Sequence, residues 1–282
     1  MATVVSMINM KGGVGKSTLT FNLAWRSAWK ENLRVLAVDL DPQANLSQYF
    51  LGAQAYLELL QKSKTIVDVF EQFSAPNAAH GAPTLVQPHE VIHKLREWTD
   101  GSLLHLVPSR LELSWTLKNP TEKAHLLPQF LSRVQDQYDL IIIDCAPTES
   151  ILTVAAYRSS RYVFVPVRPE FLATIGLPLL ARSLNEFKLQ HPGQVIDMGG
   201  IIFNGLRRTN TPNEQIRSMA DVAEIAKKQG WSVLKNAAHH SDSYPAGSRD
   251  GTPIFQTNYA RDYVVSEFNN VSDEFLRKVG LK

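Results

Sequence analysis

Cysteine is almost absent from this sequence, and so are long apolar runs. Cys145 is the single cysteine among 282 residues, so the chain has no internal disulfide and lacks the cysteine pairs that zinc and iron–sulfur sites usually need. No apolar run approaches the ~18 residues of a membrane span, and no basic leader precedes an apolar stretch at the N-terminus. We therefore expect a soluble, cytoplasmic protein in which Cys145 is a small buried residue rather than a nucleophile.

Net charge is also small. Charged residues make up 20% of the chain and give a formal net charge of +2, which does not by itself indicate nucleic-acid binding. The balance is uneven, because residues 1–150 are slightly acidic and residues 151–282 are basic, so any basic face is expected in the second half. With 44% hydrophobic residues the chain can bury a sizeable core, and we expect a single domain over residues 1–282.

A glycine-rich stretch, KGGVGKST, lies at residues 11–18 between an apolar run at 3–8 and an amphipathic run at 17–29. Glycines let the backbone turn tightly with successive N–H groups pointing inward, and a following helix adds its positive N-terminal end. Lys16 would then reach the β- and γ-phosphates of a nucleotide, and the Ser17 hydroxyl would bind Mg²⁺. The alternative is a glycine-rich turn with two solvated lysines. The candidate nucleotide-binding residues here are Lys11, Gly12, Gly13, Val14, Gly15, Lys16, Ser17 and Thr18.

Carboxylates end two of the expected strands. Asp39 and Asp41 occupy alternate positions at the end of the run 34–40, so both side chains can point to one place beyond the strand. Two neighbouring carboxylates repel each other unless a cation or hydrogen bonds intervene, which makes Mg²⁺ plausible there. An Asx turn capped by Pro42 is the alternative. Asp144 closes the uninterrupted apolar run 140–143, where a carboxylate can bind Mg²⁺ directly or through water.

The glycine-rich stretch departs from the usual G-x-x-x-x-G-K-[ST] pattern, because Met10 stands where a glycine is expected. With Lys11 beside the first retained glycine, it resembles the deviant Walker A box, K-G-G-x-G-K-[ST], of the ParA/MinD family of P-loop ATPases. In that family the first lysine reaches across a dimer interface to the partner's nucleotide. The resemblance therefore implies that Lys11 acts in trans and, with Lys16, belongs to the catalytic group.

The resemblance extends to other segments. The sequence D-x-D-P-Q looks like the family's second motif, which implies that Asp41 positions or polarises the attacking water and that Asp39 holds the outer shell of Mg²⁺. Residues 144–147 resemble a Walker B carboxylate followed by the D-x-x-P switch segment. Asn204 follows a strand where family members often place an adenine-contacting asparagine, and the absence of an [NT]-K-x-D sequence favours ATP over GTP. The implied magnesium ligands are Ser17, Asp39 and Asp144.

Alternating apolar runs and helical patterns predict an α/β fold. We expect the three-layer architecture of P-loop NTPases, with a mainly parallel central sheet flanked by helices on both faces. The expected strands are residues 3–8, 34–40, 103–107, 140–143, 162–167 and 200–203. The expected helices are 17–29, 174–189 and 264–279, with further helical patterns over 110–137.

Residues 52–102 are the least legible part of the sequence. Helical spacing occurs at 56–60 and 65–73, and residues 74–88 are expected to form a loop because they are rich in Ala, Pro, Gly and His. His89 and His93 stand four residues apart on an expected helix, but no third ligand accompanies them, so a solvated helix face is the preferred interpretation. This family-variable segment could carry partner specificity.

A basic loop at 207–210 is the candidate contact with nucleic acid. ParA-type proteins that bind DNA present arginines here, so Arg208, with Arg207 and Arg217, is the candidate phosphate-binding group, and simple solvation is an equally acceptable interpretation. Thr211 and Pro212 predict a helix start, with the threonine as the cap and the proline at the first helical position. Residues 237–241 lack the basic side chains that many chromosomal ParA relatives carry, which weakens the DNA interpretation.

The resemblance implies a function. We expect an ATPase for plasmid or chromosome partition or cargo positioning, which forms a homodimer with ATP, binds nonspecific DNA on the nucleoid, and is reset when a ParB-like or other adaptor stimulates hydrolysis. A MinD-like membrane-cycling regulator is disfavoured because acidic residues interrupt the helix expected at 264–279. A deviant Walker A ATPase with a protein partner and no DNA, or a metabolic or metal-transfer relative, also remains open.

Overall fold

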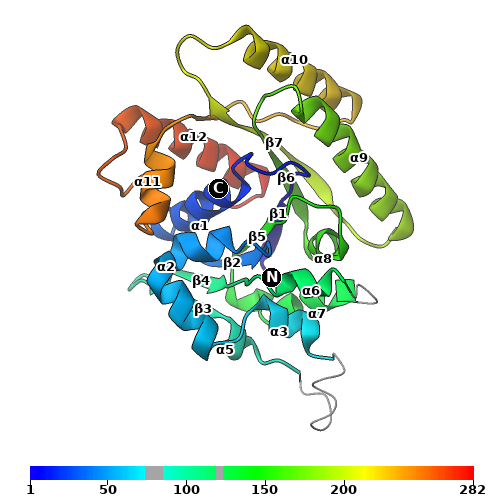
Figure 1. Ribbon diagram of the computed structural model, residues 1–282, viewed down its shortest axis with the longest axis vertical. Coiled ribbons are helices and arrows are strands. Elements are labelled where there is room, and N and C mark those ends of the chain that lie inside the picture. The colour runs from blue at the N-terminus through cyan, green and yellow to red at the C-terminus, as the bar shows by residue number, and fades with distance from the viewer. Residues whose placement is uncertain (74–84, 119–122) are drawn as a thin grey trace.

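A computed structural model describes residues 1–73, 85–118 and 123–282. Its centre is an eight-stranded sheet with the strand order β3-β4-β2-β5-β1-β6-β7-β8. In Figure 1 the sheet runs from β3 and β4 in the lower part of the view to β7 in the upper part. Neighbouring strands are parallel except for β3 and β4, which are antiparallel. The strands are β1 (Thr3–Met7), β2 (Arg34–Leu40), β3 (His93–Glu97), β4 (Leu103–Val107), β5 (Leu140–Cys145), β6 (Tyr162–Val167), β7 (Asp197–Leu206) and β8 (Ala238–His239).

Helices cover both faces of the sheet, as expected (Figure 1). One face packs against α1 (Lys16–Lys30), the start of α2 (Asn45–Lys62), α11 (Ser243–Arg249) and α12 (Asp262–Lys278). The other face packs against α3 (Ile66–Glu71), α5 (Pro88–Val91), α6 (Leu113–Thr116), α7 (Leu126–Ser132), α8 (Ile151–Ser159), α9 (Ala173–Gln190) and α10 (Asn213–Lys228). Short 3-10 turns lie at η1 (Lys123–His125) and η2 (Gln135–Gln137).

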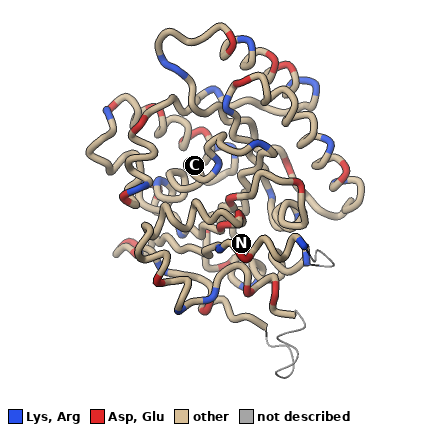
Figure 2. Tube along the Cα trace, in the orientation of Figure 1, with Lys and Arg blue, Asp and Glu red and all other residues tan. Residues whose placement is uncertain are grey.

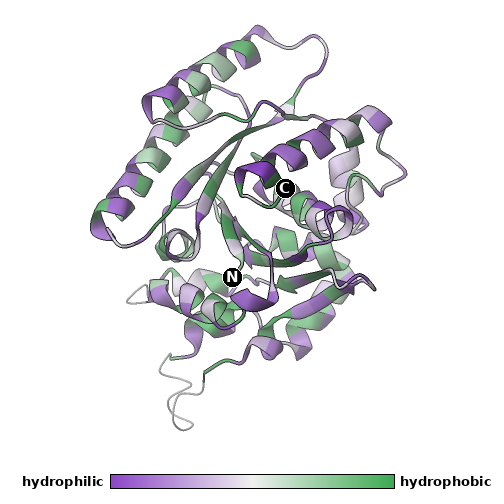
Figure 3. Cartoon of the chain, turned by 180° about the vertical axis from the view of Figure 1, so that it is seen from behind, coloured by the Kyte–Doolittle hydropathy of each residue, from purple (hydrophilic) through white to green (hydrophobic). Residues whose placement is uncertain are grey.

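The two hydrophobic cores follow from the alternation of side chains along each strand. In β1, Val4 belongs to the core beneath α7, α8 and α9, whereas Val5 and Met7 belong to the core beneath α1 and α12. All six residues of β5 are buried, as expected for a central strand covered on both faces. Figure 3 shows the strands as mainly hydrophobic and the helices as mixed. Because these strands are parallel, the carboxyl ends of β1, β2, β5, β6 and β7 meet at one edge of the sheet.

The segment 52–102 holds the main differences from expectation. An antiparallel edge strand, β3, begins at His93, whereas His89 lies in the short helix α5, so the two histidines do not share one helix. The sequence gives little sign of this strand because most of β3 is exposed and its residues, HKLRE, are polar. The expected loop at 74–88 lies mostly outside the described residues, and Pro88 begins α5.

Two further expectations need correction. The helical pattern over 110–137 forms short pieces, α6 and α7 with the 3-10 turns, and residues 119–122 are outside the described part of the chain. The helix α10 begins one residue later than predicted, with Pro212 rather than Thr211 at the cap. The Thr211 hydroxyl instead donates to the Arg207 carbonyl at 2.9 Å, so it closes the preceding loop.

No helix in the described ranges has the length and apolar character needed to cross a bilayer.

Candidate functional site

The phosphate loop, residues 11–18, connects β1 to α1 with the geometry expected for an anion cradle. Gly13 and Gly15 have φ angles of +73° and +90°, a region that side chains other than glycine rarely adopt. Gly15 caps the N-terminus of α1 without a side-chain cap, so the first N–H groups of the helix remain available to a ligand. Gly12 and Gly13 are exposed, and Val14 is buried beneath the loop. The loop is therefore open on one side and anchored on the other.

Asn204, on β7, holds this loop. Its Nδ2 donates to the Val14 carbonyl at 2.8 Å. A Cβ placed on Gly15 would lie 2.0 Å from the same Nδ2 atom, so only glycine fits between the loop and the asparagine. Sequence reasoning assigned Asn204 to the base of the nucleotide, and that role stays a prediction.

Lys16 is the buried cation of the loop. Its side chain begins the first turn of α1, the residue is 6% exposed, and its Nζ lies 3.4 Å from the Lys11 carbonyl. Burial lowers the pKa of Lys16, whereas Asp144 and Asp41 raise it. Among the described residues its Nζ has one long hydrogen bond, to a backbone carbonyl, so a bound anion would compensate the charge that burial has desolvated.

Asp39 is buried and makes hydrogen bonds within the protein that the sequence does not indicate. It is fully buried, and its carboxylate accepts hydrogen bonds from the Ser47 hydroxyl at 2.6 Å, the Ser47 N–H at 2.8 Å and the Asp41 N–H at 3.2 Å. Burial raises the pKa of Asp39 to about 7, although these hydrogen bonds oppose the rise. Ser47 also accepts from the Ser109 N–H at 2.9 Å. Asp39 thus joins β2 to the start of α2 and the end of β4.

Asp144 is the carboxylate without a partner. It stands beside Asp39 in the sheet register and is fully buried. Neither of its oxygens has a hydrogen-bond partner among the described residues. Burial raises the pKa of Asp144 well above its ordinary value, and Asp39 adds to this, whereas Ser17 and Lys16 lower it. The Ser17 hydroxyl is close enough to act on the Asp144 pKa, but its geometry is not that of a hydrogen bond. An unpartnered buried carboxylate of this kind calls for a cation.

Asp41 lines a pocket together with the phosphate loop. Its Oδ1 accepts from the Gln43 N–H at 2.9 Å, and the residue is 6% exposed. The pocket has a volume of about 400 Å³, enough for a small ligand. Its lining residues are Gly12, Gly13, Gly15, Lys16, Ser17, Thr18, Asp41, Gln43, Asn45, Tyr49 and Pro147. The structure thus brings the loop and Asp41 around one cavity. No group of three or more His, Cys, Asp or Glu side chains in the described ranges forms a metal site by itself.

Lys11 forms an ion pair with Glu170 of its own chain. Its Nζ lies 2.5 Å from Glu170 Oε2, and Arg168 Nε lies 2.9 Å from the other oxygen of the same carboxylate. The buried Asn9 fixes the loop nearby, since it accepts from the Lys11 N–H at 2.9 Å and donates to the Pro166 carbonyl at 2.7 Å. Sequence reasoning missed Glu170 and Asn9. The sequence does show two charged residues, Arg168 and Glu170, after the strand 162–167. They lie near Lys11 because that strand is the neighbour of β1 in the sheet.

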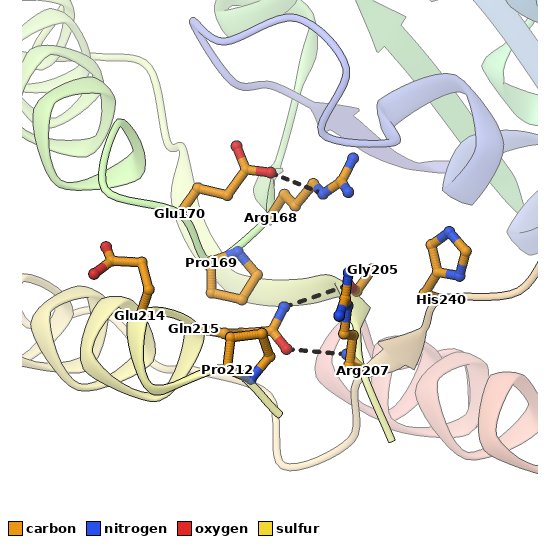
Figure 4. A pocket seen from close by; sticks show the side chains of 9 residues that line it. All are labelled: Arg168, Pro169, Glu170, Gly205, Arg207, Pro212, Glu214, Gln215 and His240. Carbon is orange, nitrogen blue, oxygen red and sulfur yellow. Dashed lines mark hydrogen bonds and ion pairs between the residues drawn. The ribbon is translucent and has the colours of Figure 1, made fainter. Parts of the chain in front are cut away.

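A second pocket, of about 250 Å³, lies beyond β6 and β7 (Figure 4). Glu170 and Arg168 line one side of it, and His240 lines another. The Gln215 amide accepts from the Arg207 N–H at 3.0 Å and so holds the chain after β7 against α10. The cavity therefore has charges of both signs on its walls.

The three arginines predicted to bind DNA are exposed and have different surroundings. Arg207 lines the second pocket, and Arg217 is exposed on α10. Arg208 folds back onto α12, where its guanidinium lies 2.8 Å from Glu267 and 4.3 Å from the ring centroid of Tyr263. Figure 2 shows basic and acidic residues interleaved along α10 rather than segregated.

Cys145 is buried, as expected, and burial raises the pKa of its thiol.

Several known proteins are similar to this chain in sequence or in fold. A family model described as an AAA domain matches residues 2–195. An uncharacterized protein of Mycobacterium tuberculosis is 30% identical over 256 residues, which are 90% of this chain and 72% of that protein. The chromosome-partitioning ATPase Soj of Treponema pallidum is 30% identical over 206 residues, which are 72% of this chain and 71% of Soj. The structure of Cyanothece McdA in complex with ATP has a TM-score of 0.79 at 17% identity, covers 100% of this chain and 97% of that one, and shows a common fold.

Proposed function

The chain belongs to the ParA/MinD family of P-loop ATPases, and on that premise we propose that it is a ParA-type ATPase that partitions a plasmid or chromosome or positions another cargo. The observation that carries the proposal is the meeting of three features at one edge of the sheet. A phosphate loop with positive-φ glycines, the buried Lys16 and the unpartnered carboxylate of Asp144 converge there. Together they provide sites for an anion and for its counter-cation.

We assign the pocket at the phosphate loop to the triphosphate of ATP with Mg²⁺. The loop N–H groups and Lys16 would hold the β- and γ-phosphates, and Asn204 would contact the base. Ser17 and Asp144 fit the metal because one offers a hydroxyl oxygen and the other a carboxylate that has no hydrogen-bond partner in the part of the chain that the structure describes. Asp39, tied to Ser47, would hold the outer shell. When bound, Mg²⁺ neutralises charge that develops on the phosphate oxygens.

Asp41 is the candidate for positioning the attacking water. Asp41 lines the pocket, and the Gln43 N–H fixes one of its carboxylate oxygens, so the other oxygen would orient a water toward the γ-phosphate. Lys11 would act in a second subunit. Triphosphate carries about four negative charges, which one lysine and one divalent cation do not balance, so a lysine from the partner would complete the neutralisation. ATP would therefore drive formation of a homodimer.

In this proposal the dimer binds nonspecific DNA and so associates with the nucleoid in the cytoplasm, and a ParB-like or other adaptor stimulates hydrolysis. Arg208 would contact DNA phosphates after leaving Glu267, and Arg207 and Arg217 are the accompanying candidates. The Arg208–Glu267 pair also supports a second candidate, an ATP-dependent dimer that acts on a protein partner without DNA. Binding of random duplex DNA with ATP, measured at several salt concentrations, separates the two.

The decisive experiment for ATP-dependent dimerisation uses the variant Lys11→Ala. The variant should bind Mg-ATP but stay monomeric in light scattering with a non-hydrolysable ATP analogue, whereas the wild type dimerises. Lys30→Ala, at the exposed last turn of α1, is the matched control and should dimerise normally. A normal dimer of Lys11→Ala would contradict the trans role of Lys11, and a wild type that stays monomeric with the analogue would contradict ATP-dependent dimerisation.

A further inference from the structure

Tyr49, on α2, lines the pocket at the phosphate loop but belongs to none of the motifs described above. It lies two residues after Ser47, which ties the start of α2 to Asp39 through a hydroxyl–carboxylate hydrogen bond of 2.6 Å. Asn45, four residues before Tyr49 and so on the same side of the helix, lines the same pocket. The first turns of α2 therefore form one wall of the cavity, and Tyr49 belongs to that wall.

The ring of Tyr49 is held by aromatic packing between α2 and α1. It packs edge-on against Phe21 of α1, with ring centroids 6.0 Å apart and an interplanar angle of 72°. Phe21 is fully buried and also packs against Phe50 at 4.9 Å, so its own position is constrained. Thr18, one turn before Phe21 on α1, lines the pocket as well. Hence Tyr49 lies beside the first turn of α1.

The Tyr49 hydroxyl is available to a ligand. It makes no hydrogen bond within the part of the chain that the structure describes, and it is accessible to solvent rather than buried without a partner. Tyr56, two turns farther along α2, differs because its hydroxyl donates to the Ser109 carbonyl at 3.1 Å. In a pocket assigned to phosphates, a phenolic hydroxyl can donate to an anionic phosphate oxygen.

We infer that the Tyr49 hydroxyl donates a hydrogen bond to a phosphate oxygen that ATP and ADP have in common. The inference rests on the proposed function and adds a binding residue to the same pocket. The backbone N–H groups of a phosphate loop cradle the α- and β-phosphates, and Tyr49 lies at the end of the loop where α1 begins. Asp41, the candidate for positioning the water at the γ-phosphate, instead follows the end of β2. Tyr49 should therefore contribute to nucleotide affinity and not to the chemical step.

The test removes the hydroxyl and keeps the ring. In calorimetry, Tyr49→Phe should raise the dissociation constants of Mg-ADP and of a non-hydrolysable ATP analogue by a similar factor, at least about fivefold, because a hydrogen bond to a charged oxygen is lost. In steady-state hydrolysis KM should rise while kcat stays within about twofold of the wild type. The melting temperature without nucleotide should not change, because phenylalanine keeps the packing on Phe21. Tyr259→Phe, at a position that is 61% exposed and outside this pocket, is the matched control.

A second measurement uses the wild-type protein and does not depend on the stability of a variant. Tyrosine is labelled with ¹³C at the ring carbon that bears the hydroxyl, and Mg-ADP is added during NMR. The Tyr49 resonance should shift, because its hydroxyl changes partner from water to phosphate. The Tyr259 resonance should stay in place, because that residue lies outside the pocket.

The outcomes separate this inference from the function on which it rests. If both dissociation constants stay at wild-type values and the Tyr49 resonance does not shift, the inference is wrong, even where Gly15→Ala supports the phosphate cradle. If only the affinity for the ATP analogue falls, the hydroxyl contacts the γ-phosphate, and if kcat falls at constant KM, it acts in the chemical step. Either result overturns the inference. If the wild type binds neither nucleotide, the proposed function fails as well.

Discussion

Asn204 and Val14 are joined by a hydrogen bond of 2.8 Å, although 190 positions separate them in the chain. The Asn204 amide donates to a carbonyl inside the phosphate loop and fills the space that a side chain at residue 15 would occupy. The conformation of the loop is therefore set from two directions. Glycine permits the backbone angles, and β7 supplies the group that holds them.

Gly15→Ala should damage nucleotide binding more than overall stability. At a φ of +90° an alanine costs of order 1–3 kcal/mol in backbone strain, and its Cβ would displace Asn204 from Val14. We expect the affinity for Mg-ATP to fall by at least about tenfold in calorimetry, which corresponds to 1.4 kcal/mol or more. Gly193→Ala, where no atom of the described residues lies within 4 Å of the added carbon, is the control and should change neither affinity nor melting temperature. An unchanged affinity for Gly15→Ala would contradict the assignment of the cradle.

Asp41→Ala should separate binding from turnover. The variant keeps the phosphate loop and Lys16, so it should bind Mg-ATP and dimerise, but phosphate release should fall by about 10²-fold or more because the water loses its orienting carboxylate. Asp221→Ala, on the exposed surface of α10, is the control and should turn over normally. Phosphate release at the wild-type rate from Asp41→Ala would show that another group positions the water.

Arg208→Ala and Glu267→Gln should have opposite effects on DNA binding. Removing the guanidinium should weaken binding of random duplex DNA with ATP and lower the slope of log affinity against log salt by ~1. Removing the Glu267 charge should strengthen binding, because Arg208 no longer has its competing partner at 2.8 Å. Arg182→Ala, an ion-paired arginine on α9, is the control. If neither DNA affinity nor its salt slope changes in Arg208→Ala, the second candidate function, without DNA, is favoured.

Sequence patterns were sufficient for the features that depend on local order. The phosphate loop, the strands before and after it and the carboxylate at the end of β5 each need a fixed run of residue types, so they could be located from the letters alone. The helices α9 and α12 were also located correctly, because their apolar residues recur with helical spacing.

Contacts between distant segments could not be found in this way. The pairs Lys11–Glu170, Arg208–Glu267 and Asp39–Ser47 join residues whose separation carries no periodic signal. Similarly, β3 is an exposed edge strand, whose polar residues resemble those of a loop or a solvated helix. Such features are decided by the packing of the whole chain, so the sequence indicated the chemical groups of the site but not how they are held.

A buried histidine should make the stability of this protein depend on pH. His105, on β4, is 8% exposed and lies between the Tyr138 hydroxyl, 2.9 Å from Nδ1, and Glu97, 3.2 Å from Nε2. Burial lowers the pKa of His105, although Glu97 opposes this. The unfolded chain therefore binds a proton more readily near its ordinary pKa of about 6.5. Stability from this residue should be fully present above that pH and should be lost as the pH falls below it.

His105→Gln is the variant that tests this dependence. At pH 7.5 it should be less stable than the wild type by ~1 kcal/mol, since it keeps at most part of the hydrogen bonding to Tyr138 and Glu97. Between pH 7.5 and pH 5 its free energy of unfolding should fall less steeply than that of the wild type, because the group that gains a proton on unfolding is gone. Urea unfolding at several pH values measures both effects, with His240→Gln, at an exposed position, as the control. Parallel pH profiles for wild type and His105→Gln would mean that His105 takes up its proton equally well in the folded and unfolded chain.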